Sequence, residues 1–348
     1  MMFFAFKKPK RLIQVFFKVH FRGFSLHFHY FCRTMEGTVI RNTGSQYIVR
    51  LDSGAELPCK VKGNFRIKGL RTTNPVAVGD RVETGTPGTD GVAFITAVLL
   101  RRNYIIRRST NLSKAAHIIA ANIDCAVLVA TLAHPATPLT FIDRFLATAE
   151  AYNVPAVLAI NKIDLLPDAE DRELLDAVLG LYRSIGYKAV GVSAATGEGM
   201  DKLLEILAGK TSLMSGNSGV GKSTLINALI PGLNLRTGEI SAAHDTGMHT
   251  TTFSEMFDLP GGGEIIDTPG VRGFGTVEFQ PEEVGHYFPE IFRLSEECRF
   301  GNCTHTHEPG CAVLDALEEH RISQSRYASY LSILEETREG SDKYRKPF

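Results

Sequence analysis

The chain has 348 residues, of which 44% are hydrophobic and 22% charged, and its formal net charge is zero. These values fit a soluble globular protein of two or three domains and exclude a single small module. The charge is uneven, since residues 1–34 carry about seven Lys and Arg and no acidic residue. A basic front end favours a polyanionic partner, although exposed basic side chains are often only solvated surface. Because no apolar run is long enough to cross a bilayer, we expect no membrane contact.

Residues 1–34 form an extension that is rich in basic and aromatic residues and has no small-residue cleavage site. Three interpretations are open: an organellar address, a helix on a membrane surface, or upstream sequence before a true start at Met35. We favour the third, because strand-like alternation begins immediately at MEGTVIRNTGSQYIVRL.

Residues 35–102 are predicted to form a small β-barrel. About five short runs of strand-forming residues are separated by turn signals such as DSG and TPGTDG. The runs are GTVIRN, QYIVRL, ELPCKV, DRVETG and VAFITAVLL.

A different pattern follows a basic connector at residues 103–116. Apolar strands now alternate with amphipathic helices, which is typical of a parallel α/β sheet. The expected strands are 125–131, 154–160, 188–194 and 211–216, and the expected helices are 139–152, 169–185 and 199–208. A helix from about Lys222 and two further strands complete the pattern, which ends near Phe274. We expect a last helical stretch at 312–336.

A phosphate-binding loop is predicted at residues 216–223, where GNSGVGKS matches G-x-x-x-x-G-K-S between a strand and a helix. The backbone N–H groups can bind phosphates, Lys222 can neutralise the β- and γ-phosphates, and Ser223 can bind Mg²⁺. The expected nucleotide contacts are Gly216, Asn217, Ser218, Gly219, Val220, Gly221, Lys222, Ser223 and Thr224.

A guanine-reading motif, NKID at 161–164, follows a predicted strand. Asp164 can accept hydrogen bonds from the guanine N1–H and amine, and adenine would leave this carboxylate unpaired. Asn161 would tie loops together, and the stem of Lys162 would cover the base. In the later loop SAATGEG, we expect Ser193 and Ala194 to close over the guanine. The sequence therefore predicts GTP rather than ATP.

Two switch segments complete the set of GTPase motifs. In DTPG, Asp267 would hold a Mg²⁺-bound water and the Gly270 N–H would meet the γ-phosphate. In the run HTTT, we choose Thr251 as the Mg²⁺ ligand, with Thr250 as the alternative because the sequence does not fix the register.

The order of these motifs is reversed relative to a Ras-like GTPase, in which the phosphate loop comes first. Placing residues 216–275 before 123–209 restores the Ras-like succession. We interpret this as a circular permutation, which is tolerable because domain termini usually lie at the surface and often close together. One consequence is that the segment after DTPG leads directly into the C-terminal region, so the nucleotide state could move that region.

The six cysteines comprise three scattered residues and a cluster within residues 298–311, which favours a metal site in a reducing compartment over disulfides. The spacing C-x4-C-x-H-x5-C offers Cys298, Cys303, His305 and Cys311 as a closed structural zinc site. His307 is a nearby competitor.

The permuted order and the cysteine pattern together resemble the circularly permuted GTPases of small ribosomal subunit maturation, the RsgA/YjeQ family. The likeness covers about residue 35 to the C-terminus. It rests on MEGTVIRNTGSQYIVR, NKIDLL, GNSGVGKSTLIN, HTTT, DTPGVRGF and CRFGNCTHTHEPGC. The family register favours His305 as the zinc ligand.

This resemblance implies an α/β P-loop GTPase domain between an N-terminal OB-fold barrel and a C-terminal, mainly helical zinc domain. We assign these parts to residues 103–278, 35–102 and 279–348. The implied function is GTP hydrolysis stimulated by the small (30S) subunit during its late assembly. The implied cofactors are one structural Zn²⁺, and Mg²⁺ with GTP. We expect a cytoplasmic monomer whose partner is the small subunit and its 16S rRNA.

Two details of this interpretation concern catalysis and RNA. Val271 replaces the water-orienting glutamine of Ras-like enzymes, so intrinsic hydrolysis should be slow. His249 is our candidate for the missing group, and the alternative is a surface histidine beside the switch. A basic stretch of the barrel is expected to contact the rRNA backbone: Lys60, Lys62, Arg66, Lys68 and Arg71, with Phe65 among them.

Two rival functions remain at this stage. A non-hydrolysing, GTP-gated RNA-binding adaptor would be consistent with Val271. A translation or tRNA-modification GTPase would use the barrel for a different RNA.

Overall fold

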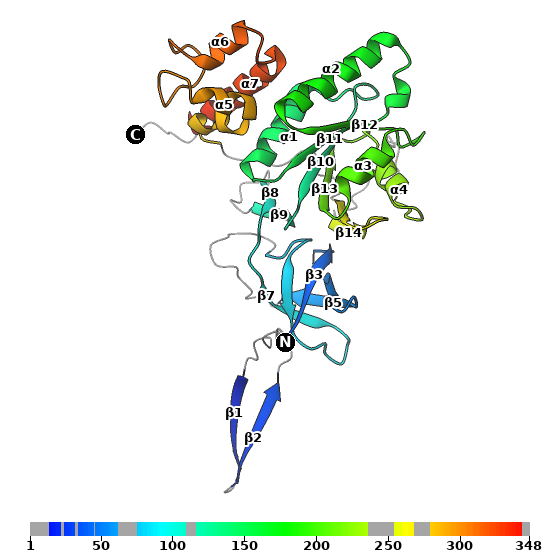
Figure 1. Ribbon diagram of the computed structural model, residues 1–348. Helices are drawn as coiled ribbons and strands as arrows, with labels where there is room; N and C mark the ends of the chain where they lie inside the picture. Colours follow the sequence, from blue (N-terminus) through cyan, green and yellow to red (C-terminus); the bar gives the residue numbers. More distant parts are fainter. Residues whose placement is uncertain are drawn as a thin grey trace, which may run out of the picture.

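The computed structural model describes residues 14–21, 24–31, 34–44, 46–61, 75–108, 116–235, 254–267 and 279–342. From the N-terminal hairpin onward, the chain builds a barrel, a central sheet with helices on its faces, and a C-terminal group of helices (Figure 1). The hairpin pairs β1 (Gln14–Phe21) with β2 (Phe24–Phe31) in antiparallel register. This part of the extension is therefore not the helix that one interpretation required, and its run of aromatic and β-branched residues favours strands.

Five strands form the barrel, and the strand at the end of their spatial order pairs with the strand at its beginning. The strands are β3 (Met35–Asn42), β4 (Tyr47–Leu51), β5 (Glu56–Val61), β6 (Arg81–Thr84) and β7 (Ala93–Val98). Their order is β3-β4-β5-β7-β6, and β6 pairs back onto β3. Val39, Val49 and Ile95 fill the interior with neighbouring apolar side chains. A closed five-stranded barrel of this kind confirms the predicted OB-type fold.

The central sheet has the order β12-β11-β10-β13-β15-β14, with the first five strands parallel and β14 antiparallel to β15. Its strands are β10 (Cys125–Ala130), β11 (Ala156–Ile160), β12 (Lys188–Gly191), β13 (Thr211–Gly216), β14 (Ser254–Asp258) and β15 (Glu264–Asp267). All residues of β10 and β11 are buried, as expected for a parallel sheet covered on both faces. The predicted α/β architecture is confirmed.

Two helices cover each face of the sheet. On one face, α1 (Leu139–Ala151) and α2 (Ala169–Ile185) contribute Phe145 and Leu179 to the larger core. On the other, α3 (Met200–Leu207) and α4 (Lys222–Leu229) contribute to a second core. Helix α2 carries acidic residues in its first turn, and it ends at Gly186, whose φ of 119° lies in the left-handed region. The short 3₁₀ helix η1 (Ile163–Leu165) lies within the NKID motif.

The described parts of the basic connector expected at 103–116 contribute to a pair of strands instead. Strands β8 (Tyr104–Arg108) and β9 (Ala116–Ala121) pair in antiparallel register. The Asn103 amide group joins their ends, since its side chain both donates to the Ile123 carbonyl (2.8 Å) and accepts from the Ile123 N–H (2.9 Å). The β-branched residues of YIIRR and AHIIAA, rather than the basic ones, set the local structure.

The C-terminal region contains more helices than the single expected stretch. They are the 3₁₀ helix η2 (Pro281–Tyr287), α5 (Pro289–Ser295), α6 (Ala312–Glu318) and α7 (Gln324–Asp342). The stretch predicted at 312–336 is split, because the chain leaves α6 through His320, whose φ of 58° is left-handed. Ala147 of α1 belongs to the same core as Phe288 and Tyr330, so this region packs on the GTPase-like sheet domain.

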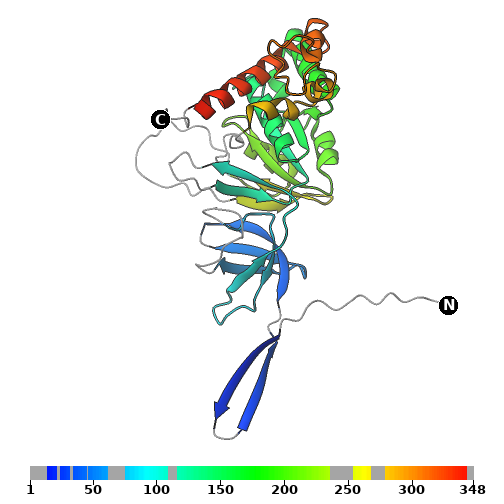
Figure 2. The same ribbon diagram turned by 90° about the vertical axis from the view of Figure 1, so that its left-hand side faces the viewer.

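The barrel is continuous with the far edge of the sheet, because β3 also pairs with β14. Figure 2 shows the barrel extending from that edge, away from the C-terminal helices. Within the described part of the chain, no helix combines the length and apolar character needed to span a membrane.

Candidate functional site

The candidate nucleotide site lies where the parallel strands end. Strand β11 leads into NKID, β12 into SAATGEG, β13 into the phosphate loop, and β15 ends at Asp267. Because β10, β11, β12, β13 and β15 are parallel, these segments meet at one edge of the sheet, where α/β folds bind ligands. Motifs separated by about fifty residues in sequence, in the reversed order, are therefore neighbours in space.

The phosphate loop needs its glycines. A Cβ on Gly216 would lie 2.6 Å from the Val129 carbonyl oxygen, and a Cβ on Gly221 would lie 2.6 Å from Asn161 Nδ2. Gly219 and Gly221 both have φ near 84°, a conformation that glycine adopts without steric cost. Val220 is fully buried and anchors the loop, whereas Ser218 and Gly219 are exposed. Lys222, Ser223 and Thr224 then open α4.

The NKID motif is tied to the phosphate loop by two side chains. Asn161 is buried, donates to the Val220 carbonyl at 2.9 Å, and accepts a hydrogen bond of 3.3 Å from the N–H of Ala194. Lys162 donates from its ammonium group to the Gly219 carbonyl at 2.6 Å. These contacts hold the base-reading and phosphate-binding segments in one rigid unit.

Asp164 is exposed and positioned by Ser193, whose hydroxyl donates to Asp164 Oδ1 at 2.6 Å. The Ser193 oxygen also accepts from the Thr196 N–H at 3.1 Å, which fixes the SAATGEG loop. A carboxylate held in this way retains lone pairs for two N–H donors of a guanine.

Lys222 and Asp267 form an ion pair across the ends of α4 and β15. Both side chains are largely buried, with exposed fractions of 14% and 9%. The Asp267 carboxylate therefore compensates the largely buried positive charge of the Lys222 ammonium group.

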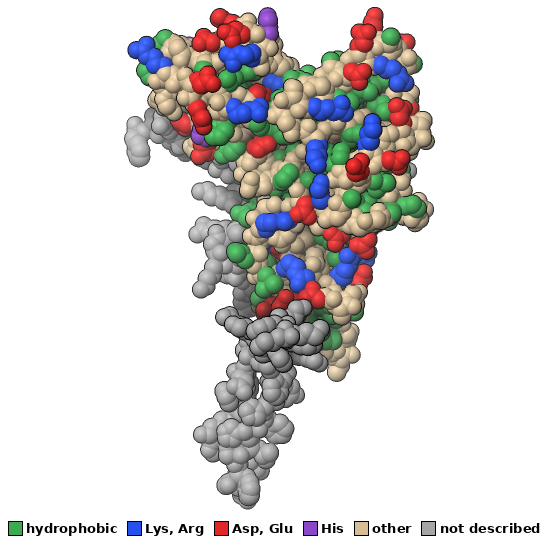
Figure 3. Space-filling model, in the orientation of Figure 1, with side chains coloured by type: hydrophobic (Ala, Val, Ile, Leu, Met, Phe, Trp, Pro, Cys, Tyr) green, Lys and Arg blue, Asp and Glu red, His purple; other side chains and the backbone are tan. Residues whose placement is uncertain are grey.

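Several predicted site residues fall outside the described residues. These are His249, Thr250 and Thr251 of the first switch, and Gly270 and Val271 after Asp267. Most of the basic stretch of the barrel falls outside them too: Lys62, Phe65, Arg66, Lys68 and Arg71. Lys60 is described and half-buried on β5. On the face shown in Figure 3, basic and acidic side chains of the described residues are interspersed, without one dominant basic patch.

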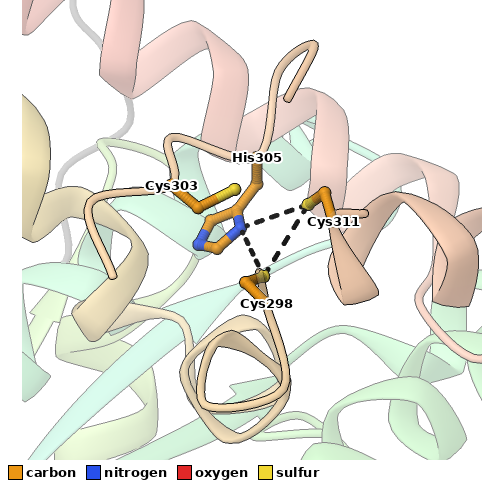
Figure 4. Close-up of side chains that lie close together, drawn as sticks. All are labelled: Cys298, Cys303, His305 and Cys311. Carbon is orange, nitrogen blue, oxygen red and sulfur yellow. Dashed lines mark hydrogen bonds between the residues drawn. The ribbon is translucent and has the colours of Figure 1, made fainter. Parts of the chain in front are cut away.

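The four residues of the cysteine motif meet between α5 and α6 (Figure 4). The ligand atoms of Cys298, Cys303, His305 and Cys311 all lie within 4.8 Å of one another. Cys298 Sγ lies 3.6 Å and Cys311 Sγ 3.4 Å from His305 Nδ1, and the two sulfurs are 3.9 Å apart. Tetrahedral zinc bonds imply S···N edges of about 3.5 Å and S···S edges of about 3.8 Å, so the cluster fits zinc.

His307 is not part of this cluster. It is exposed, and its Nδ1 lies 2.8 Å from the Thr306 hydroxyl. Burial lowers the pKa of His305, which keeps its imidazole neutral and suited to a metal. Burial also raises the pKa of the Cys303 thiol to about 12, so without a metal that thiol keeps its proton.

Sequence reasoning missed the residues that shape the cysteine cluster. Glu308 accepts hydrogen bonds from the N–H and hydroxyl groups of Thr304 and from the N–H groups of Thr306 and His307. Burial opposes its charge, but these bonds prevail and lower its pKa. The hydroxyl of Tyr327 on α7 donates to the His305 carbonyl at 2.7 Å. Of these residues, only Glu308 could have been singled out from the sequence, because it lies between the predicted ligands His305 and Cys311.

Comparison with known proteins agrees with this geometry. A family model described as RsgA GTPase matches residues 98–277, and one described as RsgA N-terminal domain matches residues 36–92. The chain is 59% identical over 314 residues to the small ribosomal subunit biogenesis GTPase RsgA of Bacteroides fragilis, covering 90% of this chain and 100% of that protein. It is 60% identical over 318 residues to the protein of the same description from Porphyromonas gingivalis, with the same coverage.

Solved structures give the same answer. The crystal structure of YjeQ from Thermotoga maritima superposes with a TM-score of 0.70 at 36% identity, covering 88% of this chain and 99% of that one. The crystal structure of YloQ, described as a circularly permuted GTPase, gives a TM-score of 0.68 at 28% identity, covering 91% and 97%. The predicted resemblance and the permuted GTPase fold are confirmed, and the chain belongs to the RsgA family of GTPases.

Proposed function

We propose that this GTPase binds the small ribosomal subunit and hydrolyses GTP to assist the late maturation of that subunit. The observation that carries the proposal is the assembly of NKID, SAATGEG, the phosphate loop and Asp267 at one sheet edge, in a chain with an OB-type barrel and a cysteine–histidine cluster. Relatives that are 59% and 60% identical to this chain are described as small ribosomal subunit biogenesis GTPases.

In this proposal, the phosphate loop from Gly216 to Thr224 binds the phosphates, while Asn161, Lys162, Asp164, Ser193 and Ala194 hold the guanine. Lys222 exchanges Asp267 for the β- and γ-phosphates when nucleotide enters. The freed Asp267 would hold a Mg²⁺-bound water, Ser223 and Thr251 would bind Mg²⁺ itself, and the Gly270 N–H would meet the γ-phosphate. Bound Mg²⁺ would neutralise negative charge on the β- and γ-phosphates as GDP leaves.

His249 is our candidate for orienting the attacking water, because Val271 has no hydrogen-bonding side chain. In the presence of small subunits, His249→Ala should lower GTP turnover by about 100-fold or more, with GTP affinity unchanged. An unchanged stimulated rate would instead make His249 a surface histidine beside the switch.

The cysteine–histidine cluster is proposed to hold one structural zinc ion that shapes the C-terminal region for rRNA contact. The barrel would contact the backbone of 16S rRNA through its basic stretch, with a salt dependence set by the number of phosphates bound. A cytoplasmic monomer is the proposed state, and light scattering of the purified protein would test the monomer.

The deciding experiment measures GTP turnover with small subunits, with large subunits, with tRNA and alone. Stimulation by small subunits alone supports the proposal. No stimulation by any RNA would favour the non-hydrolysing adaptor, and preference for tRNA would favour a tRNA-modification GTPase.

A specificity swap makes this experiment sharper. In Asp164→Asn, an amide N–H₂ replaces a carboxylate oxygen, so the site should reject the guanine amine and accept the C2 carbonyl of xanthine. The variant should lose GTP turnover and gain small-subunit-stimulated XTP turnover. Retained GTP preference would contradict the role given to Asp164.

A further inference from the structure

The loop that follows β10, residues 131–137, lies beside the nucleotide site although it carries none of its motifs. Its two ends are joined by hydrogen bonds from the Thr137 N–H to the Thr131 carbonyl (2.7 Å) and from the Thr131 N–H to the Thr137 hydroxyl (3.1 Å). The Thr131 hydroxyl also donates to the Pro135 carbonyl inside the loop. Thr131 and Thr137 are buried, whereas His134, Pro135 and Ala136 at the tip are exposed. The loop is thus a closed unit with an exposed tip.

This tip contacts two separate elements of the nucleotide site. The Lys162 ammonium donates to the His134 carbonyl as well as to the Gly219 carbonyl of the phosphate loop. A Cβ on Gly219 would lie 3.3 Å from Pro135 Cδ, so the proline ring lies directly against the phosphate loop. One cation therefore joins the phosphate loop to residues 131–137, and hydrogen bonds from a charged donor are about twice as strong as neutral ones.

We propose that residues 131–137 are a positioning element of the nucleotide site, which fixes the Lys162 side chain against the base and slows nucleotide release. The proposal rests on the proposed role of Lys162 in holding the guanine. A long lysine side chain loses much conformational freedom when it is held in one geometry. The two carbonyls that bind its ammonium fix that geometry before the nucleotide arrives, which strengthens binding by preorganisation.

The test is the rate at which a fluorescent GDP analogue leaves the protein when excess unlabelled GDP is added. Thr131→Val removes the hydroxyl that holds the Pro135 carbonyl and should speed release about three- to tenfold, the value of one neutral hydrogen bond. Thr131→Ser keeps the hydroxyl and should restore the slow rate. Thr148→Val is the matched control, because the buried Thr148 hydroxyl donates only within α1, to the Arg144 carbonyl at 2.8 Å.

Two further variants separate positioning from general destabilisation. Pro135→Ala alters only the exposed tip, should also speed release, and carries the test if Thr131→Val does not fold. Lys162→Ala should speed release by itself, and adding Thr131→Val to it should change the rate less than twofold, because residues that act through one shared contact are not additive.

Wild-type release rates in both Thr131→Val and Pro135→Ala would overturn the inference. The inference would also be overturned if the rate increases of Thr131→Val and Lys162→Ala multiplied in the double variant, because residues 131–137 would then not act through Lys162. If the wild-type protein fails to bind the GDP analogue, the proposed guanine site itself is wrong, a result that differs from both of these.

Discussion

The GTPase domain meets its two neighbours in different ways. At the C-terminal junction, the buried Arg326 of α7 donates to Asp143 of α1 (2.8 Å) and to both oxygens of Glu290 of α5 (2.6 and 3.1 Å). The Tyr182 hydroxyl of α2 donates to the same Asp143 oxygen at 2.7 Å. Burial opposes the charge of Arg326, but hydrogen bonds and attraction from the two carboxylates prevail and raise its pKa.

The barrel junction depends on the main chain instead. Strands β3 and β14 pair through Asn42 with Ser254 and Arg41 with Glu255. Nearby, the Ala121 N–H donates to the Val78 carbonyl at 3.0 Å, and Gly79 lies directly against the Ala121 carbonyl. The ion pairs that join β3 and β4 to β14 and β15 are partly exposed, as in Arg41–Glu255, where the exposed fractions are 49% and 30%.

The two junctions should therefore respond to different substitutions: the C-terminal junction to loss of a charged side chain, and the barrel junction to an atom added to its main-chain contact. A buried ion cluster fails when one partner is removed, because the remaining charges stay buried without compensation. Main-chain pairing tolerates most side chains but not a new atom in the contact. Strands β14 and β15, which adjoin the predicted switch segments HTTT and DTPG, lie beside the junction that is sensitive to shape. The C-terminal region is attached by specific charges.

Loss of the proposed zinc ion should have the largest effect, and it should affect only the C-terminal junction. A structural zinc contributes about 10–16 kcal/mol in small zinc peptides. Here its loss should disorder residues 298–311. This segment contacts α7, the helix that carries Arg326, because the Tyr327 hydroxyl donates to the His305 carbonyl and the Tyr330 hydroxyl to the Thr304 carbonyl. Cys298→Ser should lose zinc, measured with a chelating dye, and its C-terminal region should be cleaved faster by protease. Cys59→Ser, in the barrel core, is the control with unchanged zinc content. Retention of one zinc per chain in Cys298→Ser would contradict the ligand assignment.

Arg326→Ala should destabilise the protein by about 3–5 kcal/mol, because Asp143 and Glu290 would be left buried without a cation. Denaturant unfolding of the C-terminal region measures this change. Arg144→Ala is the matched control, since Arg144 pairs with Glu336 at the surface (28% and 53% exposed) and should cost less than about 1 kcal/mol. Equal effects of the two substitutions would remove the distinction between the junctions.

Arg326 also shows where prediction from sequence ends. The strand–loop–helix context of GNSGVGKS and the spacing of the cysteines identified sets of residues that the structure brings together, because each motif is local or follows a buried strand. The α/β alternation and the barrel were predictable for the same reason, since hydrophobic periodicity is local. An arginine in a polar helix is predicted to lie at the surface, because arginine is almost never fully buried unless it is paired. The partner Asp143 lies 183 residues away, so no local pattern indicates the pair.

Two other misses have a similar cause. Strand β8 is short and ends in Arg107 and Arg108, so its β-branched pair, Ile105 and Ile106, did not outweigh the interpretation of this segment as a connector. Residues 131–137 show no motif, and their contact with Lys162 depends on the packing of β10 beside β11 and β13. Contacts between strands that are distant in sequence come from the tertiary fold, which local patterns do not encode.

Gly79→Ala should break the barrel junction through shape. Its Cβ would lie 2.0 Å from the Ala121 carbonyl oxygen, a clash that forces the two segments apart. Gly54→Ala is a close control, because both glycines have φ of 89° and nothing lies within 4 Å of a Cβ at Gly54. We expect about 1–2 kcal/mol for Gly54→Ala from the left-handed backbone alone, and a further 1–3 kcal/mol for Gly79→Ala from overpacking, about the range for an inserted methyl group. Equal thermal stability of the two variants would show that the junction yields to the added atom.

The smallest effect is expected at the Arg41–Glu255 pair. Because both side chains are partly exposed, a double-mutant cycle with alanine should give a coupling of about 0.2–1 kcal/mol that shrinks as salt is added. The main-chain pairing of β3 with β14 should survive both substitutions, and amide hydrogen exchange of β14 measures this directly. A coupling well above this range, or loss of protection in β14 when only Arg41 is replaced, would mean that partly exposed charges hold the barrel to β14. The two junctions would then depend on charge to a similar degree. Ionic strength, rather than shape, would determine the stability of the contact between the barrel and the GTPase domain.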